Sequence, residues 1–445
     1  MHISFIKERT GENIELSQFI RENSLDIHSP AALDMLMDAI GNARYVLLGE
    51  ASHGTHEYYT WRARISKRLI REKNFSMIAV EGDWPDCYQL NRYIRQYKDS
   101  ADQAKTALSA FNRWPTWMWA NWEMVEFAEW LRHHNANLPQ NSRVGFYGLD
   151  VYSLWESLHA ILGYLEKEDP ATRDLAMEAW RCFEPYIAHG GQAYGSATQQ
   201  PLVPVSCEGE VIDLLMRIRE KMQQYDQDPE AVINAEQNAM VAVNAERYYR
   251  SMMRGGPEAW NIRDHHMADT LNRLIQHQGI HSKAIIWAHN THIGDARATD
   301  MRYDGMVNIG QILNEQHDHE GVFSVGFGSF EGRVIAGRNW GDVIRSMQLP
   351  RAKPDSWEYI LHQADAKDRL MLMSDPIKDT LGTREIDHRA VGVVYNPQWE
   401  YGNYVPSLIA YRYDAFIYLD QTKALHPLHL IPDGHQTPET YPFGI

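Results

Sequence analysis

Four short apolar runs of this chain each end directly at ionisable side chains. Short apolar runs of this kind are typical of buried strands, and helical patterns at 57–72 and 122–134 lie between the early ones. Strand, helix and strand in alternation predict an α/β fold with a mostly parallel central sheet flanked by helices. The ionisable residues at the ends of the four runs are Glu50 and His53, Glu81 and Asp83, Asp150, and His289 and His292.

The stretch 153–282 contains no convincing strand. It holds long helical patterns at 153–168, 171–188, 209–225, 229–253 and 262–278, with a Gly-rich and polar break at 189–200. We therefore expect one catalytic domain over 1–445, with a large helical insertion at roughly 153–282 that covers the active-site end of the sheet. The predicted strands are 44–49, 77–81, 144–149, 284–288, 322–327, 390–395 and 415–419.

The charge balance excludes several classes of partner. The formal net charge is −16, so the surface repels phosphate backbones and anionic lipid, and neither nucleic acid nor a membrane is expected as a partner. The N-terminus lacks the features of a signal peptide, and no apolar run reaches about 18 residues. Three cysteines, Cys87, Cys182 and Cys207, favour a reducing compartment without a disulfide framework. The expected location is the cytoplasm.

The strand ends predict where the chemistry occurs. In open α/β sheets, ligands bind outside the carboxyl ends of the strands, so these side chains should meet in one crevice. A histidine can take a proton from water near neutral pH, and a carboxylate beside it fixes its tautomer. Arg62 or a second histidine could hold the carbonyl oxygen as it becomes an oxyanion. Taken singly, each histidine is a satisfied polar group and each Glu a helix cap more often than a catalyst.

Several familiar catalytic motifs are missing. The nearest match to a nucleophile elbow, 49–54, has Glu where the first Gly should be, so Ser52 is a poor nucleophile candidate. There is no phosphate-binding loop and no His-Glu-x-x-His, and the glycines at 326 and 328 do not continue into a dinucleotide fingerprint. These absences narrow the class of chemistry that the site can perform.

Tryptophan is common, with 14 copies, and four of them lie close together in the sequence. The simpler interpretation is core packing. The alternative is an aromatic wall for a large amphipathic ligand, which makes Trp117 and Trp119, together with Asp150, candidate substrate-binding residues. The four are Trp114, Trp117, Trp119 and Trp122.

At the strand ends, the sequence resembles the erythromycin esterase family. The matching blocks keep their order along the chain, and Gly-Glu-x-Ser-His-Gly combined with His-Asn-x-His is far more specific than a single loose motif. The blocks are Leu48-Gly49-Glu50-Ala51-Ser52-His53-Gly54 with Arg62, Val80-Glu81-Gly82-Asp83-Trp84, Tyr147-Gly148-Leu149-Asp150, Asn261-Ile262-Arg263-Asp264, and Trp287-Ala288-His289-Asn290-Thr291-His292-Ile293-Gly294-Asp295.

The resemblance implies a carboxylic-ester hydrolase. Family members open the macrolactone ester of erythromycin-type antibiotics, which implies a role in antibiotic resistance, and some homologues carry a label for succinoglycan biosynthesis. The residue matching His53 is the general base that activates water, without a covalent acyl-enzyme. The expected partner is thus a small-molecule ester such as a macrolide, with no required cofactor; the sequence indicates no oligomeric state. The implied catalytic set is Glu50, His53, Arg62, Glu81, His289 and His292.

Two rival functions stay open from the sequence. The same histidines and carboxylates could form a zinc or manganese site, because His289 and His292 have plausible ligand spacing. A divalent metal is therefore the alternative to a metal-free site. The other rival is a non-catalytic sugar- or lipid-binding protein of envelope polysaccharide metabolism. The number of convergent ionisable residues argues against that rival, since such groups cost stability when buried without a role.

Overall fold

The computed structural model describes residues 14–200, 206–221 and 230–429. Its centre is a nine-stranded sheet in the order β1-β8-β11-β6-β2-β5-β3-β4, with β7 paired to β6. The six neighbouring strands from β11 to β4 are parallel to one another, whereas the pairs β1–β8, β8–β11 and β6–β7 are antiparallel. The predicted fold class is therefore confirmed. The strands are β1 (Leu25–Asp26), β2 (Tyr45–Leu48), β3 (Met77–Asp83), β4 (Gly145–Asp150), β5 (Ala284–Trp287), β6 (Val322–Ala336), β7 (Arg345–Leu349), β8 (Arg369–Leu372) and β11 (Ala415–Gln421).

The central strands are apolar throughout because both faces of the sheet are covered. In β2, Val46 and Leu48 lie in one hydrophobic cluster and Tyr45 and Leu47 in another, as the two-residue repeat of a strand requires. Helices α2 (Pro30–Ile40), α3 (His56–Lys73) and α6 (Trp122–Asn135) contribute to the first cluster. Helices α12 (Glu258–Gln278), α14 (Ile309–His317) and α15 (Trp357–Ala364) contribute to the second, and α4 (Trp84–Ile94) contributes to both.

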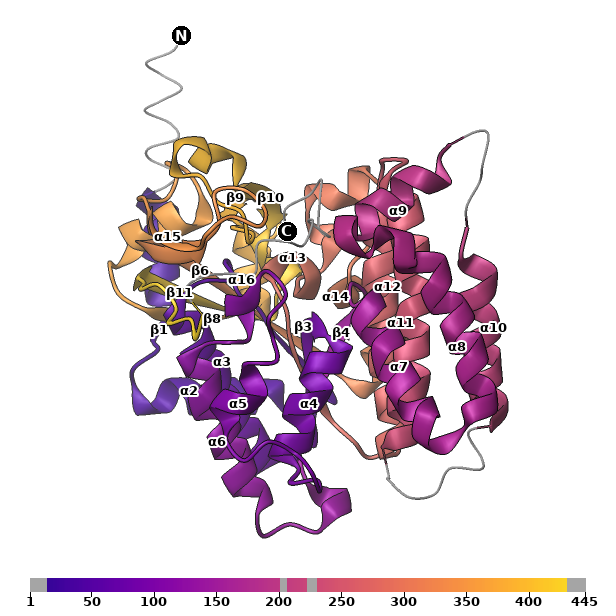
Figure 1. Cartoon of the computed structure of the whole chain (residues 1–445). Coiled ribbons are helices and arrows are strands. Elements are labelled where there is room, and N and C mark those ends of the chain that lie inside the picture. The colour runs from indigo at the N-terminus through magenta and orange to yellow at the C-terminus, as the bar shows by residue number, and fades with distance from the viewer. Residues whose placement is uncertain (1–13, 201–205, 222–229, 430–445) are drawn as a thin grey trace.

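The segment predicted as an insertion forms a helical bundle with a hydrophobic core of its own. Figure 1 shows the bundle standing beside β3 and β4, where it borders the end of the sheet from one side. Its last helix, α12, also packs on the sheet through Met267, Leu271 and Leu274. The bundle consists of α7 (Leu154–Glu168), α8 (Pro170–Phe183), α9 (Gly190–Thr198), α10 (Glu208–Lys221), α11 (Ala231–Met252) and α12.

Two expected elements differ from the structure. The segment 390–395 is not a strand of the central sheet; the strand lies just before it, as β9 (Glu385–Arg389), paired with β10 (Tyr404–Leu408) in a separate two-stranded sheet. Val391 and Tyr395 are apolar because they pack in a small cluster beside β6 and β7. The Gly-rich break at 189–200 is largely the helix α9, because the missing side chains of Gly191 and Gly195 let it lie against Tyr249 of α11.

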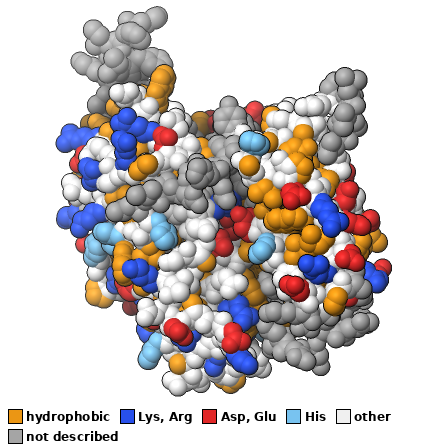
Figure 2. Space-filling model, viewed as in Figure 1, with side chains coloured by type: hydrophobic (Ala, Val, Ile, Leu, Met, Phe, Trp, Pro, Cys, Tyr) orange, Lys and Arg blue, Asp and Glu red, His pale blue; other side chains and the backbone are white. Residues whose placement is uncertain are grey.

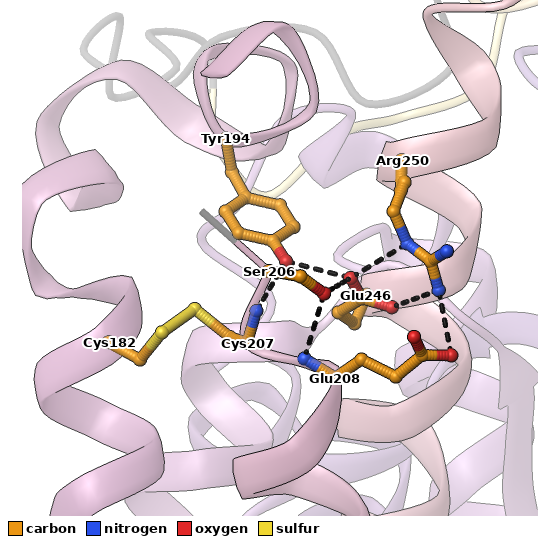
Figure 3. The surroundings of a disulfide bond; sticks show 7 residues. All are labelled: Cys182, Tyr194, Ser206, Cys207, Glu208, Glu246 and Arg250. Carbon is orange, nitrogen blue, oxygen red and sulfur yellow. Dashed lines mark hydrogen bonds and ion pairs between the residues drawn. A yellow bond between two sulfur atoms is a disulfide. The ribbon is translucent and has the colours of Figure 1, made fainter. Parts of the chain in front are cut away.

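The interpretation of the cysteines is wrong. A disulfide joins Cys182, at the end of α8, to Cys207, just before α10 (Figure 3). The backbone N–H of Cys207 also donates to the hydroxyl of Tyr194, which donates in turn to Glu246. The bundle brings the two cysteines together from 25 positions apart, which their spacing alone does not indicate. The cysteine content therefore gives no argument for a reducing compartment.

Within the described residues, no helix has both the length and the apolar character needed to span a membrane.

Candidate active site

The parallel strands β2, β5, β3 and β4 are consecutive neighbours, so their carboxyl ends form one edge. Gly49 allows the loops after β2 and β5 to touch, since a Cβ there would lie 2.2 Å from Oδ1 of Asn290. The backbone N–H of Asn290 donates to the carbonyl of Glu50 at 2.8 Å and fastens the loops together. The edge gathers six buried ionisable side chains, namely Glu50, His53, Glu81, Asp150, His289 and His292.

Glu50 and His53 form a buried pair. Nδ1 of His53 lies 2.9 Å from Oε1 of Glu50, and Nη2 of Arg62 donates to Oε2 of the same carboxylate at 2.6 Å. Gly54 follows His53 because a Cβ there would lie 2.0 Å from the carbonyl oxygen of Ile335. With Nδ1 directed at a carboxylate, the imidazole is held in one orientation, and its Nε2 is the nitrogen that can take a proton.

Arg62 lies behind this pair, away from the pocket. Its guanidinium packs over the rings of Tyr59 and Trp287, at 4.4 and 4.8 Å from their centroids, and the side chain is fully buried. The suggestion that Arg62 holds an oxyanion therefore does not fit its position, because its guanidinium is bound to Glu50 and covered by the rings of Tyr59 and Trp287. Its contact with Glu50 makes it a positioning residue for the Glu50–His53 pair.

The electrostatic surroundings favour a protonated His53. Burial disfavours the imidazolium, but the carboxylates of Glu81 and Glu50 outweigh burial and raise the pKa of His53. His289 responds in the opposite way. Burial, and then the neighbouring His53, lower the pKa of His289 well below its usual value, with the two rings 4.9 Å apart. His289 is thus neutral when His53 takes up a proton.

Both contacts of Nδ1 of His289 are with Thr291. The hydroxyl of Thr291 lies 2.8 Å away and can donate to or accept from this nitrogen, and the backbone N–H of Thr291 donates to it at 3.3 Å within the helix cap of α13 (Asn290–Ile293). In a neutral imidazole whose Nδ1 accepts, the other nitrogen carries the proton. Nε2 of His289 is buried and has no hydrogen-bond partner among the described residues. The site therefore contains an unpaired imidazole nitrogen beside His53, and this nitrogen is an N–H donor in the tautomer whose Nδ1 accepts from Thr291.

Arg263 is the electrostatic centre of the site. From α12, its guanidinium donates to both oxygens of Asp150 at 3.0 and 2.8 Å and to Oε1 of Glu81 at 2.6 Å. Its Nη1 lies 3.0 Å from Nε2 of His292. Burial raises the pKa of Glu81, but His292 and Arg263 more than offset it, so the net shift is downward. No role was predicted for Arg263; the block Asn261–Asp264 was the only signal that pointed to it.

His292 is held at both nitrogens. Since Nη1 of Arg263 can only donate, Nε2 of His292 accepts, and Nδ1–H donates to Asp264 at 2.9 Å. The indole of Trp260 stacks on the imidazole, with centroids 4.5 Å apart and planes within 5°. His292 is therefore held in one orientation, and it supports Arg263 and Glu81 more than it could act as a base.

These contacts fit a divalent cation poorly at this site. A metal would need the carboxylates of Glu81 and Asp150, but the guanidinium of Arg263 already lies between them. It would also need a free nitrogen on His292, and both are engaged. Asp150, predicted to bind substrate, uses both carboxylate oxygens to hold Arg263.

The pocket at this edge has mainly apolar walls. It encloses about 610 Å³, open solvent included, and His53, Glu81, Asp150 and Arg263 form its floor. The loop between α5 (Ala104–Leu108) and α6 supplies much of the wall, together with Tyr152 from the start of the insertion and Trp340. The wall residues of that loop are Phe111, Arg113, Trp114, Pro115, Met118 and Trp119.

The four clustered tryptophans divide between the two interpretations. Trp114 and Trp119 line the pocket, and Nε1 of Trp119 donates to the carbonyl of Glu81 at 3.1 Å. Trp117 is fully buried in the hydrophobic core, outside the pocket lining, and Trp122 is half exposed at the start of α6. Of the two tryptophans predicted to bind substrate, only Trp119 is in a position to touch a ligand.

One end of the pocket is acidic. Asp83 and Asp86 line it, and Glu156 of α7 lies close enough to interact with both; Arg113 pairs with Asp83. Burial, and then the neighbouring carboxylates Asp83 and Glu156, raise the pKa of Asp86 well above its usual value. Figure 2 shows acidic side chains gathered at the centre of one face, between the helical bundle and the rest of the chain. This end of the pocket therefore has three carboxyl groups and a single arginine beside them, an arrangement that favours a positively charged ligand group.

Ser52 is placed unlike a nucleophile. Its hydroxyl hydrogen-bonds to Thr55, and the residue is buried outside the pocket lining. The loop carries His53 to the pocket, while Ser52 braces that loop.

Comparison with known proteins gives one family and several similar folds. The family model described as erythromycin esterase matches residues 70–422. A crystal structure of a succinoglycan biosynthesis protein superposes with a TM-score of 0.71 at 22% identity, covering 93% of this chain and 98% of the other. A Bacillus cereus protein gives 0.75 at 19% identity, with 94% and 99% covered. A mutant of the erythromycin esterase EreC in its open conformation gives 0.66 at 16% identity, with 89% and 95% covered.

Proposed function

This chain belongs to the erythromycin esterase family, and on that basis we propose that it hydrolyses a carboxylic ester with a water molecule activated by His53. The observation that carries the proposal is the Glu50–His53 pair, whose imidazole lies in the floor of the pocket. Nδ1 of His53 is directed at a carboxylate, which leaves Nε2 as the base, and His53 is part of the pocket lining. The arrangement is that of a general base with an orienting carboxylate, without a nucleophilic serine.

In the proposed reaction, Nε2 of His53 takes a proton from water as the water oxygen bonds to the ester carbonyl carbon. The carbonyl becomes a tetrahedral oxyanion. Collapse of this intermediate breaks the bond to the alkoxy oxygen, which leaves with the proton from the His53 imidazolium. The products are a carboxylic acid and an alcohol. Glu50 and Glu81 stabilise the imidazolium while it exists, which the raised pKa of His53 reflects.

We propose that His289, which lies beside His53 but just outside the pocket lining, supplies the oxyanion contact through Nε2. Its Nε2–H is unpaired and buried, and its ring is 4.9 Å from that of His53. A donor fixed in a water-poor site stabilises developing negative charge strongly, by about 2.7–4 kcal/mol for one donor. The ring is held in place before substrate arrives because His289 is the N-cap of α13 and follows closely after β5. Glu81 adds to this by accepting from the backbone N–H of His289 at 2.8 Å.

We propose that the reaction needs no metal, because Arg263 supplies the buried positive charge. Its guanidinium neutralises Glu81 and Asp150 and keeps Glu81 ionised beside His53. A cation at the same place would have to displace Arg263. The rival non-catalytic envelope role gains no support from these contacts, since a binding protein has no use for an oriented base.

For the substrate, we propose a large amphipathic ester with a cationic group, a description that includes macrolides. The aromatic walls suit an apolar ring, and the acidic end formed by Asp83, Asp86 and Glu156 suits an ammonium. Asp86 has no hydrogen-bond partner among the described residues, and a substrate cation would supply one. The erythromycin esterase EreC is similar to this chain in fold.

The experiment compares wild type with His53→Asn on an erythromycin-type macrolactone and on a simple aryl ester, with and without EDTA. His53→Asn should remain folded and lose about 100-fold to 10,000-fold in kcat, as loss of a general base typically does. His319→Asn is the matched control, because His319 is 76% exposed and comes shortly before β6, at the amino edge of the sheet and not at the carboxyl edge where the pocket lies. Unchanged turnover in His53→Asn would refute the assignment. Complete loss of turnover with EDTA, in a protein whose melting temperature EDTA does not change, would refute the metal-free mechanism.

The cationic subsite has a separate test. Acetylcholine and 3,3-dimethylbutyl acetate have the same shape and differ in charge. Wild type should prefer the charged ester, and Asp86→Asn should reduce that preference at least about fivefold, since a partly buried charge pair contributes ~1–4 kcal/mol. Asp34→Asn, which changes an exposed carboxylate on α2, should not alter the ratio. An unchanged ratio in Asp86→Asn would remove the acidic end from the proposal.

A further inference from the structure

Outside the pocket, two histidines and a glutamate from three separate segments converge near the surface. His56 is the first residue of α3, Glu123 belongs to the first turn of α6, and His426 follows β11 on the C-terminal segment. Nδ1 of His56 lies 2.5 Å from Oε1 of Glu123, and Nδ1 of His426 lies 2.6 Å from the same oxygen. One donor atom from each residue falls within 4.8 Å of the others.

We propose that His56, Glu123 and His426 form a binding site for a divalent transition-metal ion of the zinc class. Two imidazole nitrogens and a carboxylate are donors that zinc prefers, and three protein ligands leave a fourth position for water. The side chains of His426 and His56 are 61% and 31% exposed, so an ion can enter from solvent. Glu123 is only 5% exposed, which holds its carboxylate in position.

The ligand geometry needs only a small adjustment. Ligands around a tetrahedral zinc lie roughly 3.4 Å apart, as bond lengths of about 2.0–2.1 Å require. The two imidazoles would therefore move away from the carboxylate by about an ångström. The exposed ring of His426 is free to make most of that movement, and the rings already stand edge to face, with centroids 5.4 Å apart and planes at 84°.

The backbone around the three ligands is already fixed. The N–H of His56 donates to the carbonyl of Lys423 at 2.9 Å, and the N–H of Trp122 donates to the carbonyl of His426 at 2.9 Å. Bridges between Thr55 and Ala424 and between Asn121 and Pro427 lie on either side. Ligands held by such a frame lose little conformational freedom on binding an ion, which favours affinity.

An ion at this place would fasten the C-terminal segment to both sides of the pocket. His56 comes three residues after His53, and Gly54 already accepts a hydrogen bond from the N–H of Leu425. Glu123 follows the loop that carries Trp119. The inference is that the ion has a structural role, in which it holds the base and the aromatic wall together without contacting the substrate.

The test is titration of chelator-stripped, full-length protein with ZnCl₂ by calorimetry, and with CoCl₂ by visible absorption. Wild type should bind one ion per chain, and Co²⁺ should give the d–d bands of a four- or five-coordinate site. His426→Ala and Glu123→Gln should each weaken binding at least about 10-fold to 100-fold, the loss that even indirect ligand partners cause. Because His426 is exposed, its variant should fold normally, which circular dichroism would check.

Two controls separate this site from others. His28→Ala removes an exposed histidine that pairs with a single carboxylate, Asp368, and should leave binding unchanged. His53→Asn should also leave binding unchanged, since His53 belongs to the pocket. Absence of stoichiometric binding in wild type would overturn the proposal. So would binding that survives His426→Ala but is lost in His53→Asn, because the ion would then belong to the active site.

Discussion

Arg263→Met is the substitution that most directly tests the electrostatic account of the pocket. The guanidinium lies 2.6 Å from Glu81 and 2.8 Å from Asp150, and those carboxylates are 2% and 4% exposed. Methionine fills a similar volume without charge, so the change leaves two buried carboxylates without their shared cation. Leaving one buried charge unpaired costs about 3–5 kcal/mol.

We expect a loss of about 3–5 kcal/mol in the free energy of unfolding at pH 7.5. In the variant, Glu81 still has two partners, the backbone N–H of His289 at 2.8 Å and the imidazole of His292 at 3.5 Å. Most of the lost stability therefore comes from Asp150. The free energy of unfolding of a typical protein is about 5–15 kcal/mol, so the variant should still fold but with little stability to spare. The assay is urea unfolding followed by far-ultraviolet circular dichroism.

The free energy of unfolding should depend differently on pH in wild type and in Arg263→Met. In wild type the pKa of Glu81 is lowered, so its contribution is present above the unfolded pKa and is lost as the solution becomes more acidic. In Arg263→Met the pKa of Glu81 should lie higher than in wild type, because one of the cations that lower it is gone, so the variant should lose less stability than wild type as the pH falls. The difference in the free energy of unfolding between wild type and Arg263→Met should therefore be greatest near pH 7.5 and should become smaller towards pH 5.

Two further variants complete the experiment. Adding Asp150→Asn to Arg263→Met should recover part of the loss, because it removes one of the unpaired charges. Arg297→Met is the control: Arg297 is 52% exposed and pairs with Asp295, so its removal should cost less than about 1 kcal/mol. A loss below about 1 kcal/mol in Arg263→Met, or one independent of pH, would refute the assignment of Arg263 as the central cation.

Three other outcomes follow from the pocket. Ser52→Ala should retain turnover within a few-fold, and a fluorophosphonate probe should leave the protein unlabelled; stoichiometric labelling at Ser52 would contradict attack by water. Trp119→Leu should raise the Michaelis constant, whereas Trp117→Leu should lower the melting temperature by removing a buried ring; steady-state kinetics and thermal melts distinguish them. Because the pKa of His53 is raised, kcat/KM should increase with pH through an inflection above the ordinary histidine value. Glu81→Gln should move that inflection to lower pH, since it removes a carboxylate that favours the imidazolium; a shift to higher pH would contradict the coupling.

Local patterns in the chain account for the sheet and for most residues of the candidate site. The runs before Glu50, Glu81, Asp150 and His289 are apolar because strands of a parallel sheet are covered on both faces. The ionisable residues come at the end of each apolar run in chain order, so they mark the carboxyl edge of the parallel strands, although all four are themselves buried. That reasoning needs only neighbours in the sequence, and it identified the edge without coordinates.

The same local reasoning failed at 390–395 and at the cysteines. Val391 and Tyr395 are apolar because they fill a space beside β6 and β7, and a buried coil segment has the same composition as a buried strand. Cys182 and Cys207 pair because α8 and the segment before α10 lie side by side in the bundle. Both outcomes depend on residues far away in the chain, so no window of sequence contains them.

The division of roles within the site was likewise decided by tertiary contacts. Arg62 and Arg263 are both buried arginines, but one packs behind Glu50 and the other joins Glu81 to Asp150 across two strands and α12. Trp117 and Trp119 are two positions apart, yet only Trp119 faces the pocket. A residue type fixes which charges and hydrogen bonds a side chain can offer, whereas its partners, and hence its pKa and role, depend on which distant segments the fold brings within 3 Å.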